Sequence, residues 1–221
     1  MTASDRAALR DAATIVLLRD DDGAGPRVLM GQRGHKAAFM PSKFVFPGGA
    51  VDAADAGVRF ARPLRPDVHA ALARRSTAAP EAVAAAALRE LAEETGQVLA
   101  RASDGAELAS GWPGFEGRAP DADPLRFVFR AVTPPGRPRR FDARFFLAPA
   151  TAVLTDPDDF SAAEDELSHL HWVPLTEARA LDMPFITEVV LAEISAIVDG
   201  TDAPGVPFFD NSGETSVFHR L

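Results

Sequence analysis

The chain has 221 residues, of which 47% are hydrophobic and 25% are charged, and its formal net charge is −9 at pH 7. These values are ordinary for a globular protein, and we expect one domain over residues 1–221. The acidic balance argues against binding to nucleic acid, which calls for a basic face. The lack of cysteine excludes disulfides, thiolate metal sites and a cysteine nucleophile.

Neither a membrane span nor a leader is predicted. No run of residues approaches the roughly 18 apolar residues that a membrane-spanning helix needs. The first residues, MTASDRAALRDAA, lack the basic-then-apolar order of a signal peptide. We therefore expect a cytoplasmic protein that does not bind membranes.

The first predicted elements are two strands that form a hairpin. Residues 13–19, ATIVLLR, are β-branched and apolar, and residues 28–33, VLMGQR, follow across a turn rich in aspartate and glycine. Arg33 lies at the end of the second strand, where it could bind a phosphate of a substrate. A solvated strand end is the alternative interpretation of Arg33.

A Pro-Gly-Gly turn at residues 47–49 follows Phe44 and Phe46, whose alternation is typical of a strand. Glycines at such a turn allow the backbone to approach a ligand closely. The long segment 51–80 comes next and is locally basic, with a short helix predicted at residues 67–75. Segments of this length are functional lids or solvated loops, and the sequence leaves both open.

The segment 81–96, EAVAAAALRELAEETG, predicts a helix that its last glycine can end. Glu90, Glu93 and Glu94 are spaced i, i+3 and i+4, which places three carboxylates on one stripe near its C-terminus. Such acids repel one another and oppose the helix dipole. Mg²⁺ or Mn²⁺ would remove both penalties, so the cluster predicts a metal site, with a solvated acidic face as the alternative. Arg89 favours the metal site, because it can hold Glu93 in one rotamer.

The second half of the chain predicts more strands and a C-terminal helix. A surface connection is expected at 101–124, strands at 126–132, 141–147 and 167–173, helices at 176–181 and 184–198, and regular structure in the tail at 206–209 or 216–218. Arg140 and Arg144 share one strand face and could line a pocket for a phosphorylated substrate, with a solvent-facing strand as the alternative. Together these elements predict an α/β sandwich with a mixed sheet between helices.

The helix at 81–96 resembles the C-terminal part of the Nudix box, whose pattern is G-x5-E-x7-R-E-U-x-E-E-x-G-U with U aliphatic. Residues 89–96, RELAEETG, match it, with Glu81 as the preceding acid and Gly49 as the opening glycine. The chain departs from the pattern in two places. A long segment separates Gly49 from Glu81 where the family has five residues, and Gln97 stands at the final aliphatic position.

The resemblance to Nudix hydrolases implies an α/β/α sandwich and a catalytic site on this helix, including Arg89. It also implies Mg²⁺ or Mn²⁺ as cofactor, and the implied metal ligands are the Gly48 carbonyl and the carboxylates of Glu90, Glu93 and Glu94. Nudix enzymes often take a further acid from a loop ahead of a late strand. Glu164 and Glu166 are candidates for that acid, either as a metal ligand or as the catalytic base.

The activity implied by the resemblance is hydrolysis of a diphosphate linkage in a small nucleoside-diphosphate-X compound. The lack of cysteine argues against the isoprenoid-diphosphate isomerases of the same fold. Residues 39–55 and the long segment after them are similar to the branch with the coenzyme A diphosphatases, which implies coenzyme A or an acyl-CoA as substrate. Arg140 or Arg144 would then contact its 3′-phosphate. ADP-ribose, nucleoside triphosphates and a non-catalytic binding module are the alternatives, and a homodimer stays open.

Overall fold

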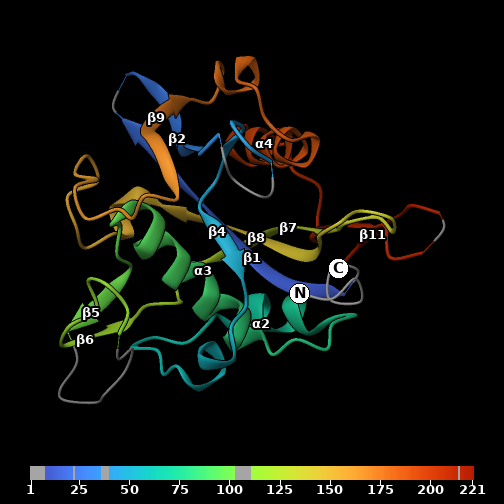
Figure 1. Cartoon of the computed structure of the whole chain (residues 1–221), viewed down its shortest axis with the longest axis horizontal. Coiled ribbons are helices and arrows are strands. Elements are labelled where there is room, and N and C mark those ends of the chain that lie inside the picture. Colours follow the sequence, from blue (N-terminus) through green and yellow to red (C-terminus); the bar gives the residue numbers. More distant parts are fainter. Residues whose placement is uncertain (1–7, 22, 36–39, 103–110, 214) are drawn as a thin grey trace.

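A computed structural model of the protein describes residues 8–21, 23–35, 40–102, 111–213 and 215–221. Within these residues, nine strands form a mixed sheet in the order β11-β10-β7-β8-β1-β2-β3, with β4 beside β1 and β9 beside β2 (Figure 1). The strands of this sheet are β1 (Leu9–Asp21), β2 (Gly25–Arg33), β3 (Phe44–Val45), β4 (Gly48–Ala50), β7 (Arg126–Val132), β8 (Arg140–Pro149), β9 (Leu167–Pro174), β10 (Pro207–Asp210) and β11 (Val217–Arg220). A separate pair consists of β5 (Ala100–Ala102) and β6 (Arg118–Pro120).

The central strand is β1, which pairs in parallel with β8 along one edge and antiparallel with β2 and β4 along the other. Its alternate residues enter two different cores. Ala13, Ile15 and Leu17 pack on one face of the sheet, and Val16 packs on the opposite face. A strand that is buried on both faces needs a nearly continuous apolar run, which explains the sequence ATIVLLR.

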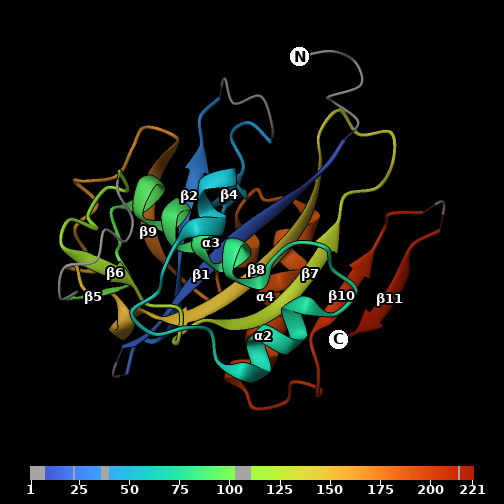
Figure 2. The same cartoon turned by 90° about the horizontal axis from the view of Figure 1, so that it is seen from below.

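Helices cover both faces of this sheet. The helices α2 (Pro66–Ala73) and α3 (Pro80–Thr95) pack on the face of Ile15, and α4 (Phe185–Val198) packs on the face of Val16 (Figure 2). Short 3-10 helices are η1 (Ala53–Gly57), η2 (Ala150–Ala152) and η3 (Ala178–Ala180). The predicted α/β sandwich with a mixed sheet between helices is therefore confirmed. None of the helices described is long and apolar enough to cross a membrane.

The helix α3 has the ends that its sequence predicts. Pro80 occupies the first turn, where a missing N–H costs nothing. Gly96 ends the helix with φ at 73°, in the left-handed region that favours glycine, and its N–H donates to Ala92 O at 2.8 Å. The small alanines between these ends are buried, so the helix backbone lies close to the sheet.

Most predicted elements are present, and several boundaries differ. The hairpin, the strands at 126–132 and 141–147, the strand at 167–173 and the helix at 184–198 are confirmed. The helix predicted at 176–181 is wrong, because only the short turn η3 forms there. The connection at 101–124 is more than surface, since Trp112 and Phe115 are buried in the core.

The segment 51–80 is built into the core and is not a detached loop. Leu64, Val68 and Leu72 are buried against α3 and the sheet. Arg62 Nη2 also reaches Asp121 Oδ2 at 2.6 Å, which ties the segment to the residues before β7. The segment is therefore a structural part of the fold, whatever further effect it has on a ligand.

Candidate active site

The glycine turn lies directly against the acidic end of α3. Residues of β4 pair with β1, and the Gly48 N–H donates to Glu94 Oε2 at 2.8 Å. A Cβ atom on Gly49 would lie 2.3 Å from Glu90 Oε1 and would push that carboxylate aside, and a Cβ atom on Gly48 would lie 2.5 Å from the Ala13 backbone oxygen. The Pro-Gly-Gly turn is thus required for the backbone to reach two of the predicted metal ligands.

Arg89 holds the other face of the acid cluster. Its Nη1 donates to Glu90 Oε1 and to Glu93 Oε2, both at 2.9 Å, so the predicted pairing of Arg89 with Glu93 is confirmed. Its Nε and Nη2 donate to Asp55 Oδ1 and Oδ2 at 3.0 and 3.1 Å. A bidentate pair of this kind fixes the plane of the guanidinium. Asp55 therefore orients Arg89, which in turn orients two acids.

Asp55 is the site residue that the sequence analysis missed. It follows Gly49 with five residues between them, which is the spacing of the opening glycine and the acid in the box. The assignment of that acid to Glu81 is wrong, because the Glu81 carboxylate is half exposed and contacts His69 Nε2 at 3.1 Å. The long extra segment therefore lies between Asp55 and Arg89. Counting from Gly49 would have found Asp55, but Glu81 also fits the spacing to Arg89.

Burial makes the negative charge of this cluster unfavourable. Burial raises the pKa of Glu94 to about 8, although the Gly48 N–H lowers it. Burial likewise raises the pKa of Glu90 to about 7, against the hydrogen bond and the charge of Arg89. The pKa of Glu93 is raised for the same reason. Near neutral pH these carboxyl groups therefore favour a bound proton or a bound cation.

The loop before β9 brings two more acids to the same end of α3. The Glu164 N–H donates to Glu93 O at 2.8 Å, and Arg33 Nη2 donates to Glu166 Oε1 at 2.7 Å. The charge of Glu166 raises the pKa of Glu94 and the charge of Arg33 lowers it, so both charges act on the α3 acids. The structure thus assembles Arg33, Glu164 and Glu166 around the cluster that the sequence predicted.

The acids are not arranged as a ready metal cluster. Within the residues that the structure describes, no three His, Asp or Glu side chains are placed to hold an ion. Each α3 acid has a partner instead, since Glu90 and Glu93 share Arg89 and Glu94 accepts from the Gly48 N–H. Glu94 Oε1, however, is buried without a hydrogen-bond partner. Hard carboxylate oxygens are the ligands of Mg²⁺ and Mn²⁺, so the donor set fits a divalent ion.

Two of the predicted substrate-binding arginines have partners outside this cluster. Arg144 is 1% exposed and forms ion pairs with Asp11 and Asp142. Arg140 Nε donates to Thr133 O at 3.1 Å. Of the three predicted arginines, Arg33 is the one whose contacts connect it to the α3 acids.

Comparison with known proteins agrees with this geometry. The model of the NUDIX domain family matches residues 8–193, so the chain belongs to the Nudix family. A curated relative from Caenorhabditis elegans, named "Putative nudix hydrolase 7", is 30% identical over an alignment of 180 residues that covers 74% of this chain and 51% of the relative. The chain thus spans about half the length of that relative.

Solved structures show the same fold. The crystal structure of a NUDIX hydrolase from Alicyclobacillus acidocaldarius is 32% identical with a TM-score of 0.65, over 89% of this chain and 94% of that one. The NUDIX domain of Shewanella oneidensis NrtR, complexed with ADP ribose, is 14% identical with a TM-score of 0.50, over 86% and 89% of the two chains. This second likeness concerns the fold alone.

Proposed function

We propose that this chain hydrolyses a diphosphate linkage in a nucleoside-diphosphate-X compound with the help of a divalent metal ion. The observation that supports the proposal most is the meeting of the glycine turn, Arg89 and the three α3 acids around the buried, unpartnered Glu94 Oε1. Clustered acids at a helix C-terminus destabilise the fold unless a cation binds them. Membership of the Nudix family supports the same activity.

The residues of the site have distinct tasks in this proposal. Glu90, Glu93 and Glu94 would hold Mg²⁺ or Mn²⁺, which would neutralise diphosphate oxygens and lower the pKa of the attacking water. Arg33 would bind a phosphate oxygen, as its position beside Glu166 allows. Glu164 or Glu166 would accept the proton of the water as its oxygen bonds to phosphorus and the bridging P–O bond breaks, which releases the other phosphate as the leaving group.

For the substrate we propose coenzyme A or an acyl-CoA. The support is the resemblance of residues 39–55 to the coenzyme A diphosphatase branch, together with the long segment between Asp55 and Arg89. Arg140 would contact the 3′-phosphate. Arg144 could do so only by leaving its buried ion pairs, which makes Arg140 the better candidate.

A panel of substrates tests the proposal. Coenzyme A, its dephospho form, ADP-ribose, NADH and nucleoside triphosphates would be assayed with Mg²⁺ and Mn²⁺, and kcat/KM compared. A preference for coenzyme A over the dephospho form would support recognition of the 3′-phosphate. A kcat/KM at least tenfold higher for ADP-ribose or a triphosphate, about 1.4 kcal/mol in transition-state binding, would rule out coenzyme A as the preferred substrate. The proposal that the chain is a diphosphate hydrolase would still hold.

The rival from another class is a binding module that keeps the fold without the chemistry. The presence of Glu90, Glu93 and Glu94 argues against it, because a non-catalytic module does not need the three acids that would hold the metal ion. Calorimetric titration with Mn²⁺ separates the two. A protein that binds no metal and cleaves no member of the panel would be a binding module.

A further inference from the structure

Gln97 occupies the place where the Nudix pattern has an aliphatic residue, and its side chain is fully buried. Its amide makes three hydrogen bonds to one loop. Nε2 donates to Asp156 O at 3.1 Å and to Asp159 O at 2.9 Å, and Oε1 accepts from Thr155 Oγ1 at 2.9 Å. Losing any one of these buried hydrogen bonds would cost free energy, so the Gln97 amide anchors the loop in one position.

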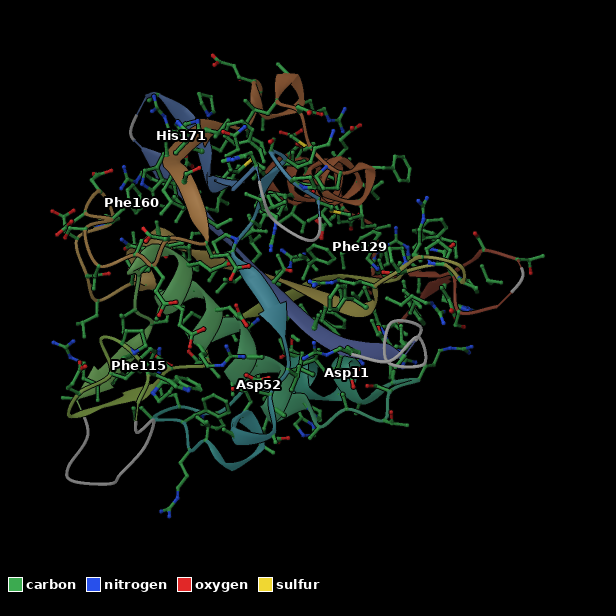
Figure 3. All side chains as sticks on the ribbon, in the orientation of Figure 1. Asp11, Asp52, Phe115, Phe129, Phe160 and His171 are labelled. Carbon is green, nitrogen blue, oxygen red and sulfur yellow. The ribbon has the colours of Figure 1, made fainter. Side chains whose placement is uncertain are left out.

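The fastened loop, residues 153–166, continues directly to the acids of the candidate site. Next to Gln97, a Cβ atom on Gly96 would lie 3.1 Å from Ala162 Cβ, so the loop is packed closely on the end of α3. The Glu164 N–H then bonds Glu93 O at 2.8 Å. Phe160, labelled in Figure 3, marks this loop beside the end of α3.

The outer side of the loop is held as well. Trp172 Nε1, on β9, donates to Pro157 O at 2.9 Å, and Arg19 Nη1 pairs with Asp158 Oδ1 at 2.8 Å. These contacts fix the outer part of the loop to the sheet. Gln97 fixes its inner part to α3, which is the element that carries the other acids.

We propose that Gln97 is a positioning residue that sets where Glu164 and Glu166 stand relative to Glu90, Glu93 and Glu94. The chemistry requires this, because loop acids can serve a site on a helix only if loop and helix are in fixed register. An aliphatic residue at position 97 could fill the space but could not hold the loop carbonyls. The expected effect on kcat/KM rests on the proposed function, whereas the anchoring of the loop by Gln97 does not depend on it.

The test compares Gln97→Met with the wild type. Met keeps much of the apolar volume and loses all three bonds. We expect kcat/KM to fall by about 10- to 100-fold. We also expect the amide hydrogens of residues 155–166 to exchange at least about tenfold faster in the metal-free protein, while those of β1 and β8 do not change.

A matched control is Asn211→Leu. Asn211 is another buried amide, and its Nδ2 donates to Val132 O at 3.0 Å, away from the loop. This variant should lose stability without faster exchange at residues 155–166 and without loss of kcat/KM. If Gln97→Met does not fold, Thr155→Val removes the bond to Gln97 Oε1 and should change exchange and kcat/KM in the same direction.

A double-mutant cycle separates positioning from general stability. In a background with Glu164→Gln and Glu166→Gln, Gln97→Met should lower the remaining kcat/KM by less than about twofold. The two carboxylates through which Gln97 is proposed to act are absent in that background. An effect as large as in the wild type would overturn the inference, and so would unchanged loop exchange. If the wild type cleaves no diphosphate, the proposed function fails. The role of Gln97 is then decided by the other two measurements: faster loop exchange and weaker Mn²⁺ binding in Gln97→Met would support it, and no change in either would overturn it.

Discussion

Two groups of buried arginines and carboxylates lie on the same face of the sheet and differ in charge balance. In the first, Arg130 Nε and Nη2 reach Asp142 at 2.8 and 2.6 Å, and Arg144 pairs with Asp142 and with Asp11 of β1, labelled in Figure 3. Two cations thus meet two carboxylates. Arg130 Nη1 also bonds two carbonyls of the 51–80 segment, so this group fastens that segment to the sheet.

In the second group one cation meets an excess of acid. Among the residues that the structure describes, Arg89 is the one basic side chain that bonds Asp55, Glu90 and Glu93, and none bonds Glu94. The pKa values are raised here, whereas the first group is closed by its own counter-charges. Balanced charges are typical of a structural network, whereas an uncompensated excess of buried acid is typical of a site that binds a cation or a proton.

Breaking the balanced group should have the largest effect, and the effect should be on stability. Asp142→Asn leaves Arg130 without its carboxylate and Arg144 with Asp11 alone. We expect a loss of about 3–5 kcal/mol in the free energy of unfolding, measured with urea, because breaking a buried ion pair strands a charge. Asp202→Asn, which breaks a more exposed pair with Arg126, should cost about 1 kcal/mol or less. Full stability of Asp142→Asn would refute the structural role.

Breaking the acid-rich group should instead remove activity. Glu94→Gln keeps an acceptor for the Gly48 N–H, so we expect an intact fold and kcat/KM lower by at least about 100-fold. Its melting temperature at pH 8 without metal should be no lower than that of the wild type, because a buried charge has been removed. Glu193→Gln on α4, where burial also raises the pKa, is the control and should keep activity. Near wild-type turnover in Glu94→Gln would show that Glu94 is not part of the active site.

Asp55 and Glu81 both match the acid that precedes Arg89 in the Nudix pattern, and substitutions distinguish them. Asp55→Asn should lower kcat/KM by about 10- to 100-fold, because Arg89 loses the partner that orients it. Glu81→Gln should leave kcat/KM unchanged and stability within about 0.5 kcal/mol, as for other surface changes. Equal effects of the two substitutions would contradict the assignment of Asp55.

The smallest expected effect is a pH dependence of the metal-free protein. The pKa values of Glu90 and Glu94 are raised in the fold, so the stability they contribute is present below about pH 4.5 and is lost as pH rises through about 7 to 8. The melting temperature should therefore fall over this range. Under the proposed function, binding of Mg²⁺ to the deprotonated acids should reduce the fall.

A single substitution isolates the contribution of one acid to that pH dependence. Scanning calorimetry from pH 5 to pH 8 would measure it, with and without Mg²⁺. The fall should be shallower in Glu94→Gln than in the wild type, because one of the two titrating groups is gone. Parallel curves for the two proteins would show that Glu94 does not titrate in this range.

Much of the fold could be predicted from local pattern. Residues 13–19 and 28–33 predicted a hairpin, and residues 126–132 and 141–147 predicted two strands, which are β7 and β8. Period and turn chemistry act between near neighbours in the chain, so they can be read without the fold. The helix at 176–181 failed because its threonine resembled an N-cap, while only the three residues of η3 form a turn.

The packing of segment 51–80 against the core could not be predicted in the same way. Its length suggested a lid or a solvated loop, but Leu64, Val68 and Leu72 fill the core beside α3. Burial of these residues depends on the face that α2 turns toward the sheet, and eight residues carry too weak a period to decide it. Replacing the segment with a short linker is therefore expected to unfold the protein, whereas the sequence predicted that the core would stay intact without it.

The sequence alone determined α3, its end at Gly96 and the stripe of three acids, because helix periodicity places residues three and four apart on one face. Only the tertiary structure decided which carboxylate outside the helix meets Arg89 and which arginines stay near the acids. Those partners are far apart in the chain, and their distances follow from the pairing of β4 with β1 and from the path of two long loops. Asp55 is buried against Arg89 and Glu81 is left at the surface for that reason, although both match the same position of the pattern.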